Sequence, residues 1–110
     1  MYVELGEGNF NSFNLKKNST ELAYTNVKVH DILMHGSGGE GLYIGETAST
    51  DVTTAFYGLK VYNNRILYSG NESVQIGKLY DTTLVNNNVV VGGGLMGYSA
   101  FGTNQDGIFQ

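Results

Sequence analysis

The chain has 110 residues, a length that suits one domain, and it carries six basic against ten acidic residues for a formal net charge of −4. Six basic residues are too few to form a cationic face that neutralises the phosphates of a nucleic acid. We therefore expect no nucleic-acid partner. No apolar run approaches the roughly 20 residues that a membrane-spanning helix needs.

The composition favours short strands and tight turns. Sixteen glycines accompany many β-branched residues and asparagines, while proline and tryptophan are absent. The absence of cysteine excludes a disulfide framework and a thiolate metal site. The low lysine and arginine content, with many Asn, Gly, Thr and Tyr residues, favours an extracellular or cell-surface location.

The first 24 residues contain two short alternating segments, Tyr2–Leu5 and Phe13–Leu15, each followed by a turn-forming cluster. We interpret them as a partial coil. Phe13 and Leu15 are then expected where Leu42 and Ile44 lie one coil later.

The next segments repeat. Val27–Gly45 aligns without a gap on Leu59–Gly77 at an offset of 32 residues (59 − 27), and self-similarity at such a period is typical of a solenoid. The identical pairs are Lys28/Lys60, Val29/Val61, Ser37/Ser69, Gly38/Gly70, Glu40/Glu72, Ile44/Ile76 and Gly45/Gly77. We predict three short strands in the first of these coils, at Thr25–Val29, Ile32–Met34 and Gly41–Ile44, with Glu46–Tyr57 as an extruded loop.

The last repeat is shorter. Leu84–Gly93 aligns on the preceding coil at an offset of 23 residues (84 − 61), which predicts that Leu84 lies beside Val61 and Val89 beside Ile66. Gly94–Gln105 is predicted to be a second extruded loop, and Asp106–Gln110 to restart the third strand.

The repeated frame V-x-V-x-(N/D)-N-x-I, followed by G-x-(G/N)-E-x-(V/L)-x-I-G, resembles the right-handed parallel β-helix repeat of the pectin-lyase-like superfamily over Thr25–Gln110. The resemblance implies an all-β, right-handed parallel β-helix of about three coils plus a partial N-terminal coil. The coils would be residues 1–24, 25–57, 58–80 and 81–110. We see no capping helix at either end, so we expect a segment of a longer β-helix whose ends are covered by further coils or another chain.

The repeat places acidic residues at the same point of successive coils. Glu40, Glu72 and Asp106 each come just before the third strand. Neighbouring rungs of a sheet lie about 4.8 Å apart, so such a column of like charges is easier to explain if it holds a cation, for which calcium suits carboxylate oxygens, or a ligand. The alternative is that these side chains extend into solvent or cap backbone amides.

A second column is interpreted as structural. Asparagine side chains stacked along the axis hydrogen-bond to one another and tolerate turn conformations. The predicted members are Asp31, Asn63, Asn64, Asn86 and Asn87.

Aromatic residues supply the candidate contacts. We expect them at outward positions or in the extruded loops, where they suit contact with sugar rings or protein. These residues are Tyr43, Tyr57, Tyr62, Tyr98 and Phe101.

The expected function is therefore structural support and recognition, with polysaccharide or other protein chains as partners. The alternative is part of a polysaccharide lyase or glycoside hydrolase of the pectin-lyase-like type, and we expect binding over catalysis.

Overall fold

The computed structural model describes residues 2–4, 13–15, 23–45 and 55–95, and every regular element in these ranges is a short β-strand. The strands are β1 (Tyr2–Glu4), β2 (Phe13–Leu15), β3 (Tyr24–Thr25), β4 (Lys28–His30), β5 (Leu33–His35), β6 (Leu42–Ile44), β7 (Phe56–Tyr57), β8 (Lys60–Tyr62), β9 (Arg65–Leu67), β10 (Val74–Ile76), β11 (Leu79–Tyr80), β12 (Leu84–Asn86) and β13 (Val89–Val91). The described residues form no helix of the length and apolarity that crossing a bilayer requires.

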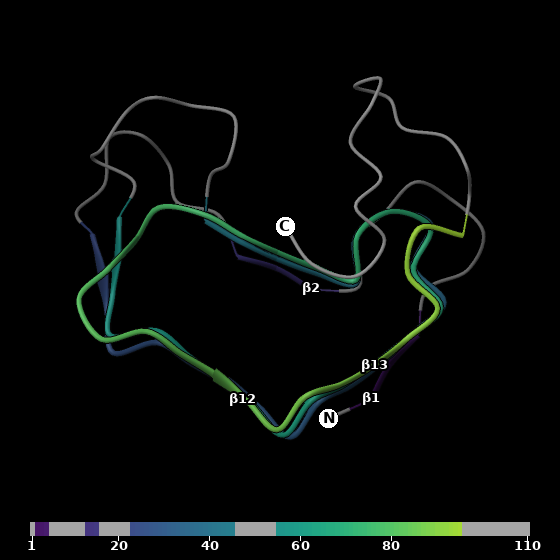
Figure 1. The fold of residues 1–110 in the computed structure, drawn as a ribbon, viewed down its shortest axis with the longest axis horizontal. Coiled ribbons are helices and arrows are strands. Elements are labelled where there is room, and N and C mark those ends of the chain that lie inside the picture. The colour runs from purple at the N-terminus through teal and green to yellow at the C-terminus, as the bar shows by residue number, and fades with distance from the viewer. Residues whose placement is uncertain (1, 5–12, 16–22, 46–54, 96–110) are drawn as a thin grey trace.

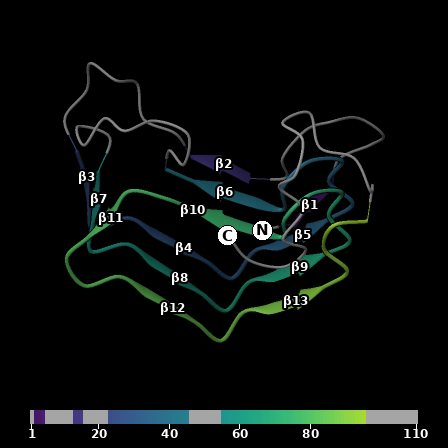
Figure 2. The ribbon, with the colours of Figure 1, turned by 45° about the horizontal axis from the view of Figure 1, so that its top comes forward.

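The strands form four parallel sheets, with the orders β1-β5-β9-β13, β2-β6-β10, β3-β7-β11 and β4-β8-β12. Each strand pairs with its counterparts in other coils and not with its neighbour in sequence. Viewed along the stack, successive coils therefore follow nearly the same path (Figure 1). The tilted view separates them, so that β4, β8 and β12 lie in series (Figure 2). The predicted all-β solenoid architecture is confirmed at this level.

Asparagine and aspartate occupy many of the corners because they tolerate the left-handed backbone conformation better than other non-glycine residues. Asp31, Asn63 and Asn87, which follow β4, β8 and β12, have φ values of 54°, 56° and 52°. The same turn thus recurs in three successive coils.

The core consists of the inward side chains of successive strands. Val29 lies beside Val61, Met34 beside Ile66, and Leu42 beside Val74, and all six are buried. Phe13 and Leu15 lie beside Leu42 and Ile44, as predicted. Burying one such side chain fully contributes about 1.5–3 kcal/mol, so this continuous column is the main source of stability.

The prediction of three strands per coil is wrong, because a fourth sheet forms from β3, β7 and β11. The predicted strand Thr25–Val29 is interrupted at Asn26, where φ is 55°. The end of the predicted loop Glu46–Tyr57 also belongs to the core, since Ala55 and Phe56 are buried. Phe56 is an inward residue that stacks on Tyr24, with ring centroids 5.0 Å apart.

The predicted register of the last repeat is wrong by one residue. Leu79 pairs with Phe56 at an offset of 23 (79 − 56), but Leu84 pairs with Lys60 at an offset of 24 (84 − 60). One extra residue therefore enters the corner 81–83. As a result Val85, not Leu84, lies beside Val61, and Val90, not Val89, lies beside Ile66.

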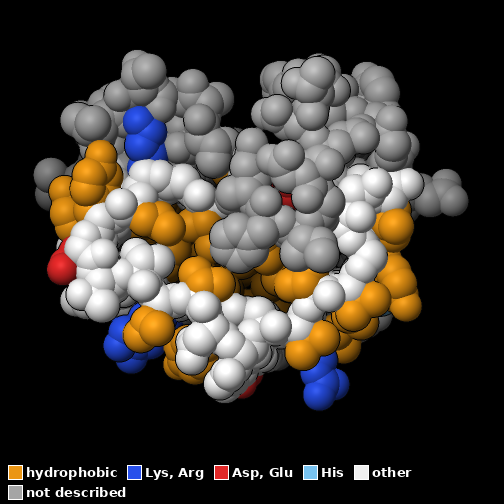
Figure 3. All heavy atoms as spheres, in the orientation of Figure 1, with side chains coloured by type: hydrophobic (Ala, Val, Ile, Leu, Met, Phe, Trp, Pro, Cys, Tyr) orange, Lys and Arg blue, Asp and Glu red, His pale blue; other side chains and the backbone are white. Residues whose placement is uncertain are grey.

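The described stack ends in β12 and β13, where the core is open. Val61 is fully buried, whereas Val85 beside it is 37% exposed. Hydrophobic side chains gather in the middle of this end face (Figure 3). That further coils or another chain cover the ends stays a prediction, as do the coil boundaries.

Candidate functional site

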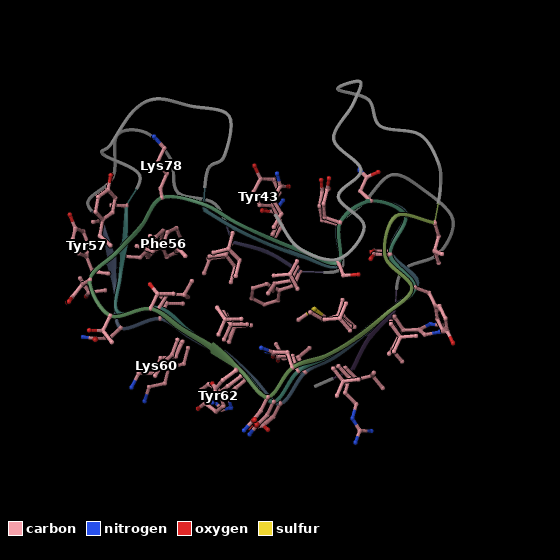
Figure 4. All side chains as sticks on the ribbon, in the orientation of Figure 1. Tyr43, Phe56, Tyr57, Lys60, Tyr62 and Lys78 are labelled. Carbon is pink, nitrogen blue, oxygen red and sulfur yellow. The ribbon has the colours of Figure 1, made fainter. Side chains whose placement is uncertain are left out.

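The sheet β4-β8-β12 presents two adjoining columns of side chains on its outward face. Val29 and Val61 point into the core, so the residues on either side of each point outward. Lys28 pairs with Lys60 and His30 with Tyr62. Figure 4 shows Lys60 and Tyr62 on the outer side of β8. Cationic and aromatic groups therefore lie side by side on one face of the sheet.

The aromatic column is tightly stacked. The rings of His30 and Tyr62 are almost parallel, at an interplanar angle of 3°, with centroids 4.7 Å apart. The Nδ1–H of His30 donates a hydrogen bond to Oδ2 of Asp31 at 2.7 Å. This hydrogen bond is the main reason why the pKa of Asp31 lies below its usual value. The bond and the stack together fix the orientation of the imidazole.

The lysine column has no acidic partner among the described residues. The one ion pair in that part of the chain joins His30 and Asp31, while Lys28 and Lys60 are both exposed. Side chains at paired positions of adjacent strands are neighbours, so the two ammonium groups repel one another. An anion placed between them would offset this repulsion. Lys28 and Lys60 are an identical pair of the aligned repeats, which was the sequence signal for this column; our predicted contacts included the adjoining Tyr62 but neither lysine.

A second exposed aromatic column lies on β7 and β11. Tyr57 pairs with Tyr80, and their rings stack with centroids 5.6 Å apart at 29°. Tyr57 was predicted as a contact residue in a loop. It remains exposed, at 41%, but a strand holds it. Its position is therefore set by the sheet.

The other predicted aromatic contacts differ in outcome. Tyr43, on β6, lies on the outer side of its sheet (Figure 4) but is only 7% exposed, and its role as a contact stays a prediction. The predicted contacts Tyr98 and Phe101 lie outside the described residues. So do most residues of the two predicted loops, 46–57 and 94–105. Among the described residues, Tyr57 and Tyr80 thus present exposed rings on one sheet face.

Two members of the predicted acidic ladder lie in adjacent coils. Backbone hydrogen bonds from Gly41 N to Glu72 O and from Leu42 N to Ser73 O continue the 32-residue register, which places Glu40 beside Glu72. Glu72 is only 2% exposed, so the alternative that it extends into solvent is wrong. Its Oε1 has no hydrogen-bond partner among the described residues.

The third member of the ladder, Asp106, lies outside the described residues. Within the described ranges, no group of three or more His, Asp or Glu side chains could together hold a metal ion. Calcium binding at Glu40 and Glu72 stays a prediction.

The asparagine ladder has a structural role, but the buried residues that form it, Asn64 and Asn88, differ in part from those predicted. Asn64 is fully buried; its Oδ1 accepts from Ile32 N at 3.1 Å and its Nδ2 donates to Val29 O at 3.0 Å. Asn88 repeats this one coil later: its Oδ1 accepts from Asn64 N and its Nδ2 donates to Val61 O, both at 3.0 Å. Asn86 lies beside Tyr62 and outside the ladder. Each asparagine therefore joins its own turn to the turn of the preceding coil.

The chain matches no family model, no curated protein and no solved structure. Its function must therefore be argued from the geometry of its own residues.

Proposed function

We propose that this chain is a recognition segment of a secreted or cell-surface protein, built on a right-handed parallel β-helix of the pectin-lyase-like kind, which binds acidic carbohydrate. The observation that carries the proposal is the outward face of β4-β8-β12, where Lys28 and Lys60 adjoin the stacked rings of His30 and Tyr62.

Both halves of this face suit an acidic glycan. Aromatic side chains offer apolar surface with a polar edge, which matches the alternating apolar and hydroxylated faces of a sugar. Two ammonium groups about one rung apart, roughly 4.8 Å, suit carboxylate or sulfate groups. Val29 and Val61 are buried beneath this face and anchor its backbone, so little backbone freedom would be lost on binding.

Titration with acidic polysaccharides, such as polygalacturonate, alginate and dextran sulfate, tests this proposal, with neutral dextran as the comparison. We expect Lys28→Ala combined with Lys60→Ala to weaken binding of an acidic glycan at least about tenfold, because about 1.4 kcal/mol corresponds to a tenfold change in affinity. Binding by the wild type should also weaken as salt rises.

The matched control is Arg65→Ala combined with Lys78→Ala, which removes the same charge from other positions. If the two double variants weaken binding equally, the interaction depends on net charge and not on this face. If the wild type binds none of the acidic glycans, the proposal is wrong.

A second function is the polysaccharide-active enzyme, and the Glu40/Glu72 pair is the observation that favours it. The two residues occupy adjacent rungs, a spacing near the roughly 5 Å between the carboxyl groups of retaining glycosidases. Incubation with the same polysaccharides, followed by assays for unsaturated products and new reducing ends, tests it. Products that disappear in a Glu72→Gln variant would support catalysis, and their absence from the wild type would contradict it.

A further inference from the structure

Tyr68 occupies a position that glycine fills in the coils on either side. Backbone hydrogen bonds from Gly36 N to Leu67 O and from Tyr68 N to Val91 O place Gly36, Tyr68 and Gly92 in one column at the corner after β5, β9 and β13. All three have a left-handed backbone, with φ values of 74°, 60° and 70°. The corner therefore requires a conformation that glycine adopts without cost and tyrosine does not.

This strain is uncommon even in a chain with many left-handed residues. Among the described non-glycine residues with positive φ, all except Tyr68 and Lys78 are asparagine or aspartate, which tolerate the conformation. Glycine at position 68 would match the neighbouring coils and remove the strain. Backbone strain that persists where a simpler residue would fit is a reason to look for a function of the side chain.

The ring of Tyr68 is held in place and half exposed. Its exposed fraction is 50%, and it meets the ring of His35 edge to face, with centroids 5.6 Å apart at 89°. It also passes close to Gly92, where an added Cβ would lie 2.9 Å from Tyr68 Cδ1 and 3.5 Å from Leu95 Cδ1. Glycine at position 92 thus leaves room for the ring, and Leu95, itself exposed, adds apolar surface beside it.

We propose that Tyr68, with His35 at its edge and Leu95 beside it, is a subsite that stacks on the face of an uncharged sugar ring. The inference rests on the proposed carbohydrate-binding function, but it concerns a different corner and a different ligand chemistry from the lysine column. Tyr68 and Leu95 offer exposed apolar surface here, and the face of an aromatic ring suits the less polar face of a pyranose.

The test uses the whole chain with neutral oligosaccharides, for example cellohexaose, mannohexaose and xylohexaose, observed by saturation-transfer NMR and isothermal titration. For an oligosaccharide that the wild type binds, we expect Tyr68→Gly to weaken binding at least about tenfold, the loss that corresponds to removing one stacked ring worth about 1.4 kcal/mol. The same variant should melt at an equal or higher temperature, because the strained conformation is relieved. Tyr68→Phe should keep most of the affinity.

The matched control is Asn87→Gly, which places glycine at another left-handed corner, with φ of 52°, and leaves Tyr68 intact. It should not alter oligosaccharide binding. The inference is overturned if the wild type binds none of the neutral oligosaccharides, if Tyr68→Gly binds as tightly as the wild type, or if it melts at a clearly lower temperature. Binding of acidic polysaccharides through Lys28 and Lys60 is measured separately, so either proposal can fail while the other stands.

Discussion

The coil of residues 55–77 and the coil of residues 78–95 have similar patterns and different environments. Val61 is fully buried and Val85, its counterpart, is 37% exposed. Ile66 is buried, whereas Val90 is only partly buried. The same contrast holds for Asn64 and Asn88. In the coil of residues 55–77, strands β7, β8 and β9 have described strands on both sides, while β10, β11, β12 and β13 pair on one side only.

This contrast shows that the coils of a stacked fold contribute unequally to its stability. The alternation along its own strand decides whether a side chain points inward. How far an inward side chain is removed from water depends on the coils above and below it. Equivalent substitutions in the two coils should therefore have unequal effects on stability, and two pairs of variants test this.

The largest difference is expected for a buried charge. Ile66→Asp should prevent folding, because an unpaired carboxylate in the core costs several kcal/mol, a large part of the about 5–15 kcal/mol by which domains are usually stable. Val90→Asp should leave a folded protein with a lower melting temperature, since water can reach that position. Circular dichroism melting curves measure both. Equal effects would show that the two positions are equally enclosed.

A smaller difference is expected in the asparagine ladder. Asn64→Ala leaves the backbone groups Ile32 N and Val29 O without their side-chain partner, and each unsatisfied buried group costs about 1–3 kcal/mol. Asn88→Ala affects Asn64 N and Val61 O, which lie nearer the open end, so we expect about half the loss. Urea unfolding measures both changes. A larger loss for Asn88→Ala would contradict this ranking.

The smallest effect concerns pH at one corner. Asp31, Asn63 and Asn87 occupy the same turn, but only Asp31 titrates. Its pKa is lowered in the folded state by the hydrogen bond from His30, so its contribution to stability is present above the usual aspartate pKa of about 3.9 and is lost as pH falls through the lower folded value. Melting of the wild type and of Asp31→Asn should differ slightly at about pH 6, and the difference should shrink as pH falls through the lowered pKa of Asp31. A difference that grows with acidity would contradict this assignment.

The register shows where sequence reasoning failed. The runs Asn86–Asn88 and Val89–Val91 consist of identical residues, so a slip of one residue left the sequence alignment almost as good. Because side chains alternate along a strand, that slip would have turned Leu84 inward in place of Val85. Two observations exclude this slip: Val85 pairs with Val61, and Nδ2 of Asn88 donates a hydrogen bond to the carbonyl oxygen of Val61.

Sequence patterns were enough to predict the all-β solenoid architecture, the 32-residue register that pairs Val29 with Val61, and the place of the asparagine corners, because these features depend on local alternation, turn preference and repetition. The fold was needed to reveal the fourth sheet, the burial of Tyr43 and Glu72, and the shared face of Lys28, His30, Lys60 and Tyr62. These features depend on which coil lies against which. Paired residues of the described strands lie 23, 24, 29, 31 or 32 positions apart, and one extra residue at a corner changes which residues pair.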